Sequence, residues 1–222
     1  MKWRVDFGPA YSLLKVYLEP GEDVTSEAGA MVMYKGNIEV KTHTGGGLLK
    51  GILRAVAGTE SLFLNTYRAV SPSEIWFAPR VPGDISYIDL ASGSWIIQDS
   101  GYLAHHGNVD ISVAWRGLRG LLAEGQLLWL KVSGRGGVWI NSYGALDRIV
   151  LNPGERAVVD NFHFVAMPAN VRWEARTFGG LKSFIFGGEG IIFEVWGPAT
   201  IYVQTRTLPL LADSLRRYIG AR

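Results

Sequence analysis

The chain has 222 residues, a formal net charge of +2 and no cysteine. The lack of cysteine excludes disulfides, thiolate metal sites, iron–sulfur clusters and cysteine nucleophiles, and the small net charge excludes indiscriminate attraction to nucleic acid. No apolar stretch approaches the roughly 18 residues of a membrane span, and the first residues lack the apolar core of a signal peptide, so a soluble cytoplasmic protein is expected.

Short β-branched and aromatic runs, separated by turn residues, fill most of the chain. The 28 glycines and 9 prolines are spread between runs such as 61–64, 75–77 and 191–195. Short strands at regular spacing, interrupted in this way, are typical of a β-sandwich or a β-barrel. The sequence therefore predicts an all-β protein.

The first strand end that enters a tight turn returns twice further along the chain. The three patterns are Leu18–Glu22, Leu90–Ser94 and Leu151–Glu155. Their glycines, which can adopt positive φ in such turns, are 72 and 61 residues apart (93 − 21 and 154 − 93). The longer first spacing predicts extra residues in the first copy, in the glycine-rich run 45–49.

A second repeated pattern places one cation between apolar residues. The cations are Lys50, Arg119 and Lys182. In three copies related by a pseudo-threefold axis they would lie on one face, where, with Arg54, they would bind an anionic membrane surface while apolar neighbours enter the interface. In the alternative interpretation, the apolar residues close the sandwich ends and the cation's stem covers them. Segment 48–57 also has the spacing of a short helix.

An aromatic residue recurs in one strand pattern. It is Trp76, Trp139 and Tyr202, at two equal spacings of 63 residues (139 − 76 and 202 − 139). Such rings can stack unpaired bases or fill the space between packed sheets, and packing is the interpretation that we favour. The spacing predicts three tandem units over 1–79, 80–142 and 143–206, followed by a tail over 207–222 whose apolar residues have helical spacing.

Candidate catalytic and metal-binding residues are few. Glu27, Asp99 and Asp160 each lie six residues after a turn glycine. Three carboxylates around an axis suit a hard cation, but near turns they more often accept local backbone hydrogen bonds, so no metal site is predicted. The adjacent His105 and His106 would face opposite sides of a strand. No nucleophile elbow or phosphate loop is present, so we expect no enzyme and no cofactor.

Several runs together resemble a family of uncharacterised prokaryotic proteins whose eukaryotic relatives are mitochondrial biogenesis proteins, named for altered inheritance of mitochondria, number twenty-four. The runs are 29–33, 45–47, Arg54, Gly58, 60–66, 101–104, 159–160, 188–190 and 204–206. The resemblance spans residues 10 to 206. It implies three β-sandwich domains similar to the tryptophan RNA-binding attenuation protein, arranged with pseudo-threefold symmetry, and it implies no established activity or ligand.

These observations favour a non-enzymatic scaffold or binding protein that self-associates, because sheets with exposed edges need covering and symmetric association is one common solution. The alternatives are a peripheral membrane adaptor that uses the basic and apolar loops, and a binder of single-stranded RNA that uses the repeated aromatics. We expect a homo-oligomer, with an anionic membrane surface as a further partner. Nucleic acid and small-molecule ligands are not expected.

Overall fold

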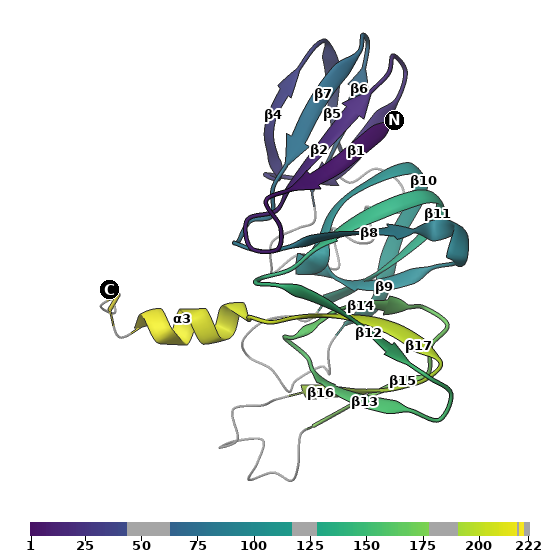
Figure 1. The fold of residues 1–222 in the computed structure, drawn as a ribbon, viewed down its shortest axis with the longest axis vertical. Helices are drawn as coiled ribbons and strands as arrows, with labels where there is room; N and C mark the ends of the chain where they lie inside the picture. The colour runs from purple at the N-terminus through teal and green to yellow at the C-terminus, as the bar shows by residue number, and fades with distance from the viewer. Residues whose placement is uncertain (44–62, 117–127, 178–190, 217, 220–222) are drawn as a thin grey trace.

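The computed structural model describes residues 1–43, 63–116, 128–177, 191–216 and 218–219. Over these residues the protein consists mostly of β-strands, with one short α-helix near the end of the chain (Figure 1). The predicted all-β class with a C-terminal helix is confirmed. The predicted helix over 48–57 lies outside the described residues.

The strands fall into three groups along the chain, which we call the first, middle and last segments. The first segment contains β1 (Lys2–Asp6), β2 (Leu13–Leu18), β3 (Asp23–Glu27), β4 (Met31–Lys35), β5 (Ile38–His43), β6 (Leu64–Ala69) and β7 (Ser73–Phe77). The middle segment contains β8 (Ile85–Asp89), β9 (Trp95–Gln98), β10 (Tyr102–Arg116) and β11 (Leu128–Asn141), with 3₁₀ turns at Leu90–Ser92 and Asp99–Gly101. The last segment contains β12 (Leu146–Leu151), β13 (Arg156–Asp160), β14 (Phe164–Pro168), β15 (Trp173–Thr177), β16 (Ile191–Trp196) and β17 (Ala199–Gln204).

The same antiparallel pairings occur in each segment. In the first segment β7 lies between β2 and β4, and β6 lies between β3 and β5. In the last segment β17 lies between β12 and β14, and β16 lies between β13 and β15. In the middle segment the end of β11 lies between β8 and the start of β10, and the start of β11 lies between β9 and the end of β10.

The two long strands β10 and β11 take the places of four shorter strands in the other segments, and glycines make this possible. Gly107 in β10 and Gly136 in β11 face each other near the middle of the pair, with φ of 87° and 140°. A Cβ on Gly136 would lie 2.0 Å from the carbonyl oxygen of His106. Only glycine fits this positive φ and this close backbone approach, where the paired strands bend from one sheet towards the other.

Strand pairing also joins each segment to the next. At the first join β3 pairs with β10, and Ser26 faces Ala104. At the second join β9 pairs with β14, and Ile97 faces Ala166. Both joins are antiparallel and connect corresponding strands. Counting from β2, β8 and β12, we call β4, the start of β10 and β14 the third strands of their segments. The second strands β3 and β9 then each pair with the third strand of the next segment.

One third strand, β4, and one second strand, β13, take part in neither of these joins. Within the described residues, β4 pairs only with β7, and β13 pairs only with β16. The two strands lie towards opposite ends of the long axis of the molecule (Figure 1). A closed threefold ring within one chain would pair β4 with β13, and the described strands do not make that join.

Three clusters of buried apolar side chains form the core, and each one crosses a segment boundary. The cluster of the first segment, which includes Phe77, also contains Trp139 from β11. The middle cluster contains Tyr202 from β17, and the last cluster contains Trp129 from β11. The segments are therefore held together by shared apolar packing as well as by strand pairing.

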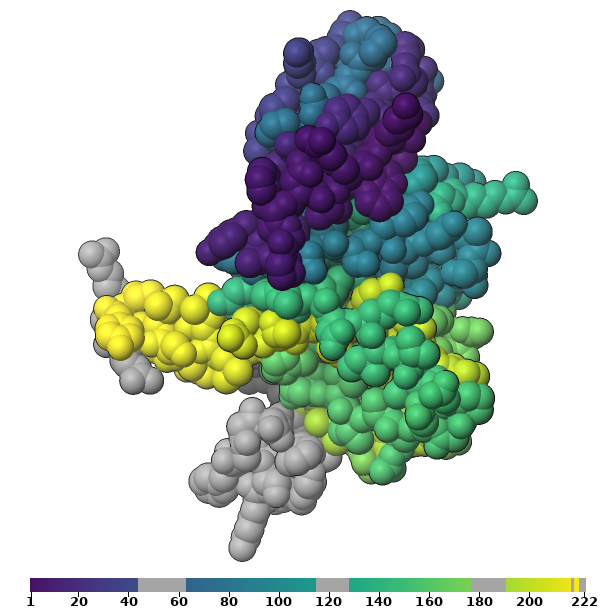
Figure 2. All heavy atoms as spheres, viewed as in Figure 1, coloured from purple at the N-terminus to yellow at the C-terminus, as the bar shows by residue number. Residues whose placement is uncertain are grey.

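The helix α3 (Leu208–Arg216) stands clear of the strands, and none of its residues is buried (Figure 2). Its exposed apolar side chains are Leu208, Leu210, Leu211 and Leu215, followed by Tyr218 and Ile219. In the part of the chain that the structure describes, no helix has both the length and the hydropathy needed to cross a membrane.

Candidate functional site

The predicted cationic face cannot be placed. Lys50, Arg54, Arg119 and Lys182 all lie outside the described residues. Binding of an anionic surface through these side chains stays a prediction.

The three repeated aromatics occupy the same place in the strand pairing. Each one lies in the last strand of its segment and faces the residue that directly follows a β-bulge in the third strand. The facing pairs are Trp76 with Met33, Trp139 with Ala104, and Tyr202 with Ala166. The equal spacing in the sequence thus corresponds to an equal position in the three sheets.

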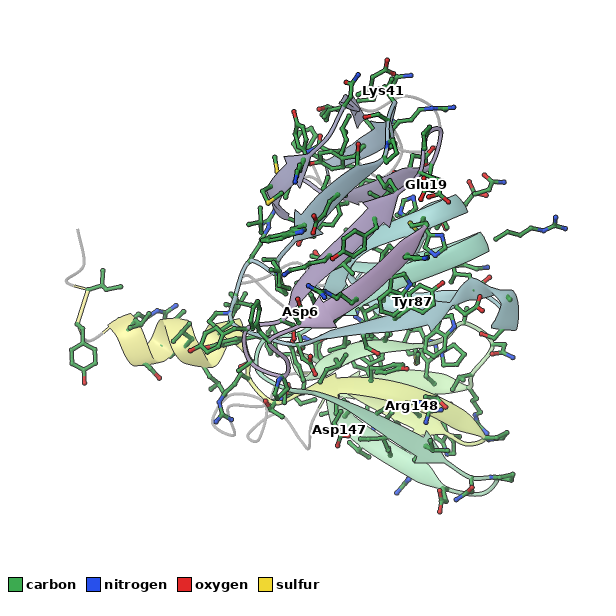
Figure 3. The ribbon with its side chains drawn as sticks, turned by 45° about the horizontal axis from the view of Figure 1, so that its top comes forward. Asp6, Glu19, Lys41, Tyr87, Asp147 and Arg148 are labelled. Carbon is green, nitrogen blue, oxygen red and sulfur yellow. The ribbon has the colours of Figure 1, made fainter. Side chains whose placement is uncertain are left out.

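Their surroundings differ, however. Trp139 is fully buried and contacts the rings of Trp3 and Tyr87 at centroid distances of 5.7 and 5.5 Å; Tyr87, labelled in Figure 3, lies where the first and middle segments meet. Tyr202 is also buried. These two rings pack in the core, and neither offers a free face to a nucleic acid base.

Trp76 is half-buried and is engaged by charged side chains. The Lys15 Nζ lies 4.1 Å from the centre of the Trp76 ring, and the indole Nε1–H donates to Glu74 at 2.6 Å. Lys15 also forms an ion pair at 3.0 Å with Asp6, the last residue of β1, which is labelled in Figure 3. A cation over the ring face stabilises this arrangement, so the three aromatics do not form one repeated binding surface.

Each of the three predicted carboxylates interacts with a nearby cation or backbone N–H group. Glu27 is buried and pairs with Arg80, with 3.5 Å between Oε2 and Nε. Asp99 accepts from the backbone N–H of Ser100, and Asp160 accepts from that of Phe162, each at 2.9 Å. Within the described residues, no three His, Asp or Glu side chains are grouped so that they could hold a metal ion.

A buried polar network lies at the first join. His105 Nδ1 lies 2.6 Å from the hydroxyl of Tyr102, which also donates to the carbonyl oxygen of Thr25 at 3.4 Å. The Thr25 hydroxyl bonds to that of Thr66, which is 2.7 Å from His43 Nε2. Burial lowers the pKa of His105 to about 4, because an apolar environment disfavours the charged imidazole. The imidazole of His105 is therefore neutral at ordinary pH, and its bond to Tyr102 is a structural contact.

His106 faces the other side of β10, as predicted for adjacent strand residues. It stacks on Tyr87 with 10° between the ring planes, and its Nε2 lies 3.0 Å from the Tyr87 hydroxyl. No pattern in the sequence indicated that His105 would be connected through Tyr102 to residues of β3 and β6. The available signal was that two histidines directly follow an apolar run, 102–104.

A cavity of about 180 Å³ lies between the middle and last segments, beside the start of α3. Its walls include the buried side chains of Gln98 and Asn141, and in the described structure the Gln98 Oε1 and the Asn141 Nδ2 have no hydrogen-bond partner. Asp99 also lines it, and burial raises the pKa of that carboxyl to about 6. A cavity of this size and polarity is suited to several water molecules.

The most distinctive surface is the edge strand β4. Its exposed apolar side chains are Met31, Val32 and Tyr34. On β13, Val158 is likewise exposed, whereas Arg156 is drawn to the buried carboxylate of Glu194 on the neighbouring strand. Apolar residues on a strand edge with unpaired backbone groups are the usual features of a site for strand pairing with another chain.

Comparisons with known proteins agree along the whole length. A family profile described as mitochondrial biogenesis AIM24 matches residues 3–206. An uncharacterized protein of Streptococcus pyogenes serotype M6 is 27% identical over 227 residues, which cover 99% of this chain and 91% of that protein. The crystal structure of a protein from Streptococcus pyogenes, solved by a structural genomics consortium, matches with a TM-score of 0.82 at 27% identity, covering 98% of this chain and 99% of that one.

Proposed function

Given that the chain belongs to the mitochondrial biogenesis AIM24 family, as its sequence resemblance indicated, we propose that it is a non-enzymatic scaffold whose copies associate with one another. One observation carries this proposal: the apolar edge strand β4 has no further strand beside it among the described residues, and no residue of the apolar helix α3 is buried. Such surfaces on a protein mark sites of association.

The helix supplies the first supporting argument. An isolated helix shorter than about 12 to 15 residues is marginal in water, because tertiary packing provides most helical stability. None of the nine residues of α3 is buried, although four leucines are available for packing and Leu210 is 62% exposed. A surface of a neighbouring copy would provide the contact that α3 lacks.

The edge strand β4 supplies the second supporting argument. Exposed strand edges are normally covered, shortened or protected by charge. On β4 the flanking Lys35 is the one charged side chain, and the remaining residues, 31–34, are apolar or aromatic. Association would remove both the apolar side chains and the open backbone groups from water.

We also propose that the three segments are copies of one sandwich unit similar to that of the tryptophan RNA-binding attenuation protein. The recurring pairings and the bulge at the same place in the third strand of each segment support this. The described strands do not close a threefold ring within one chain, so the expected pseudo-threefold relation is not part of this proposal.

Native mass spectrometry combined with light scattering over a wide range of protein concentration tests the scaffold proposal. We expect masses that are multiples of the 24.4 kDa chain. A single species of one chain at every concentration would show that the proposal is wrong.

A second candidate function, a peripheral membrane adaptor, is favoured by the composition of α3. Leu210 and Leu211 are exposed on the same short helix as Arg216, and an apolar helix face flanked by a cation can lie in a membrane interface. Co-sedimentation with anionic and neutral vesicles, using wild type and the variant Leu210→Ser/Leu211→Ser, separates this function from the first. Absence of binding to anionic vesicles at low salt rules it out.

A further inference from the structure

The two joins inside the chain follow one rule. In each, the strand that precedes the third strand of a segment pairs antiparallel with the third strand of the next segment: β3 with β10, and β9 with β14. By the same rule, β13 of the last segment would pair with a third strand that follows it, and β4 of the first segment would pair with a second strand that precedes it.

We propose that β13 of one copy pairs antiparallel with β4 of a second copy, so that chains associate head to tail. This inference rests on the proposed self-association and specifies its interface. Because different surfaces meet, the contact is heterologous, and repetition gives a ring if the rotation closes and a filament if it does not.

Burial at the joins shows what the free strands lack. At the first join, Leu103, His105 and Thr25 are 0%, 8% and 8% exposed. On the free strands, the corresponding stretches expose Val32 by 52%, Tyr34 by 44% and Val158 by 48%. The difference arises because each internal edge is covered by the next segment, and a second copy would cover the outer ones in the same way.

The first join indicates one register. Ala104, the residue after the bulge, faces Ser26, the last position before the carboxylate Glu27. The counterparts are Met33, which follows the bulge in β4, and Val159, which precedes Asp160. Pairing Met33 with Val159 places Tyr34 opposite Val158.

The second join indicates another register. In it Ala166 faces Ile97, which lies two residues before Asp99. The same count would place Met33 opposite Val158.

Charge supports the register of the first join. The register of the second, with Met33 opposite Val158, would place Lys35 directly opposite Arg156. Like charges that face each other across a strand pair are destabilising. In the preferred register Lys35 faces Ala157 instead, and the centre of the contact is apolar.

Substitutions at the two facing positions test the interface. Tyr34→Lys blocks β4, and Val158→Lys blocks β13; both side chains are exposed, so folding is expected to be retained, which circular dichroism and thermal unfolding verify. Each variant alone should lose all species larger than one chain in native mass spectrometry. A mixture of the two should form a 1:1 dimer that grows no further, because one intact β4 and one intact β13 remain.

The matched controls are Val40→Lys on β5 and Val150→Lys on β12, which are similarly exposed valines on edge strands whose counterparts take part in neither join. These should assemble as wild type does. A chain that carries both Tyr34→Glu and Val158→Lys should regain assembly, because opposite charges then face each other.

The outcomes separate the two proposals. A wild type that is always a single chain contradicts self-association itself. A wild type that assembles, together with Tyr34→Lys and Val158→Lys variants of unchanged mass, leaves the scaffold standing and overturns the β4–β13 contact. Equal dissociation of the control variants, or a mixture that forms no dimer, overturns it as well.

Discussion

Trp139 shows how a single side chain can hold two segments together. It belongs to β11 of the middle segment, yet its ring packs among residues of the first, including Trp3 on β1. An indole at this position removes a large apolar area from water on both sides of the join. Its contribution to stability therefore extends beyond the strand that carries it.

Truncation of this ring should be costly. We expect Trp139→Ala to lower the free energy of unfolding by about 3–5 kcal/mol, because a buried cavity remains. Trp139→Phe should cost less, since it keeps a ring and removes an indole N–H that has no partner in the described structure. Urea unfolding monitored by circular dichroism measures both. An alanine variant as stable as wild type would contradict the burial.

His105 should make stability depend on pH. Its pKa is lowered by burial to about 4, whereas histidine in an unfolded chain titrates near 6.5. Between these values the unfolded state binds a proton that the folded state does not, so the stabilisation is full above about pH 6.5 and is lost as pH falls towards 4. Asp99, with a raised pKa of about 6, acts in the opposite sense, and its contribution is lost as pH rises through 6.

The variant His105→Gln separates the two effects. The difference in unfolding free energy between wild type and this variant should shrink as the pH is lowered from 7 to 4, because only wild type gains a destabilising proton on unfolding. Chemical denaturation at several pH values measures it. A difference that does not change with pH would show that His105 is protonated equally in both states.

At the scale of elements, Glu194 ties together the three-stranded sheet of the last segment. It lies on β16, between β13 and β15, and its buried carboxylate receives Arg156 from one neighbour and Arg176 from the other, the latter at 2.9 Å. A carboxylate that leaves water needs such partners. The contact fixes the position of β13, the strand proposed to meet a second copy.

Neutralising this carboxylate should loosen the sheet. We expect Glu194→Gln to lower the unfolding free energy by about 1–3 kcal/mol, the usual range when a charged hydrogen bond is lost in a buried site. Glu174→Gln on β15 is the control, because Glu174 is exposed and pairs with Arg172 at its surface. Equal effects of the two substitutions would argue against a special role for the buried group.

At the scale of the whole molecule, the three segments are joined in series, and among the described residues the first segment is not paired with the last. Each internal join covers one edge, and the same kinds of edge remain at both ends, on β4 and β13. In the proposed head-to-tail association, the number of chains would be decided by the rotation from copy to copy, which either closes a ring or does not. This geometry differs from a closed ring of three units within one chain.

Association of this kind should make thermal stability depend on concentration, because binding to the native state alone raises its stability by mass action. The unfolding temperature of wild type should rise with protein concentration. That of Val158→Lys should not. Scanning calorimetry over a dilution series measures both, and a wild-type unfolding temperature that does not change with concentration would count against a native-state assembly.

Local patterns in the sequence were sufficient for the all-β class, for the terminal helix and for the opposite faces of His105 and His106. Strand alternation and helical spacing depend on neighbours a few residues away, so they can be read directly along the chain. The resemblance to the AIM24 family was also confirmed. It depends on short glycine-rich and polar runs, which can be recognised along the chain without a structure.

The exposure of each repeated aromatic and the identity of the open edges were decided only by the tertiary structure. Trp76 and Trp139 share a strand position, but Lys15 covers one while rings of another segment bury the other. Likewise, β3 and β13 occupy the same position in their segments, and it is the pairing of β3 with β10 that distinguishes them. Burial and strand partnership depend on contacts between residues far apart in the chain, and periodicity within one strand contains no information about which distant strand will lie beside it.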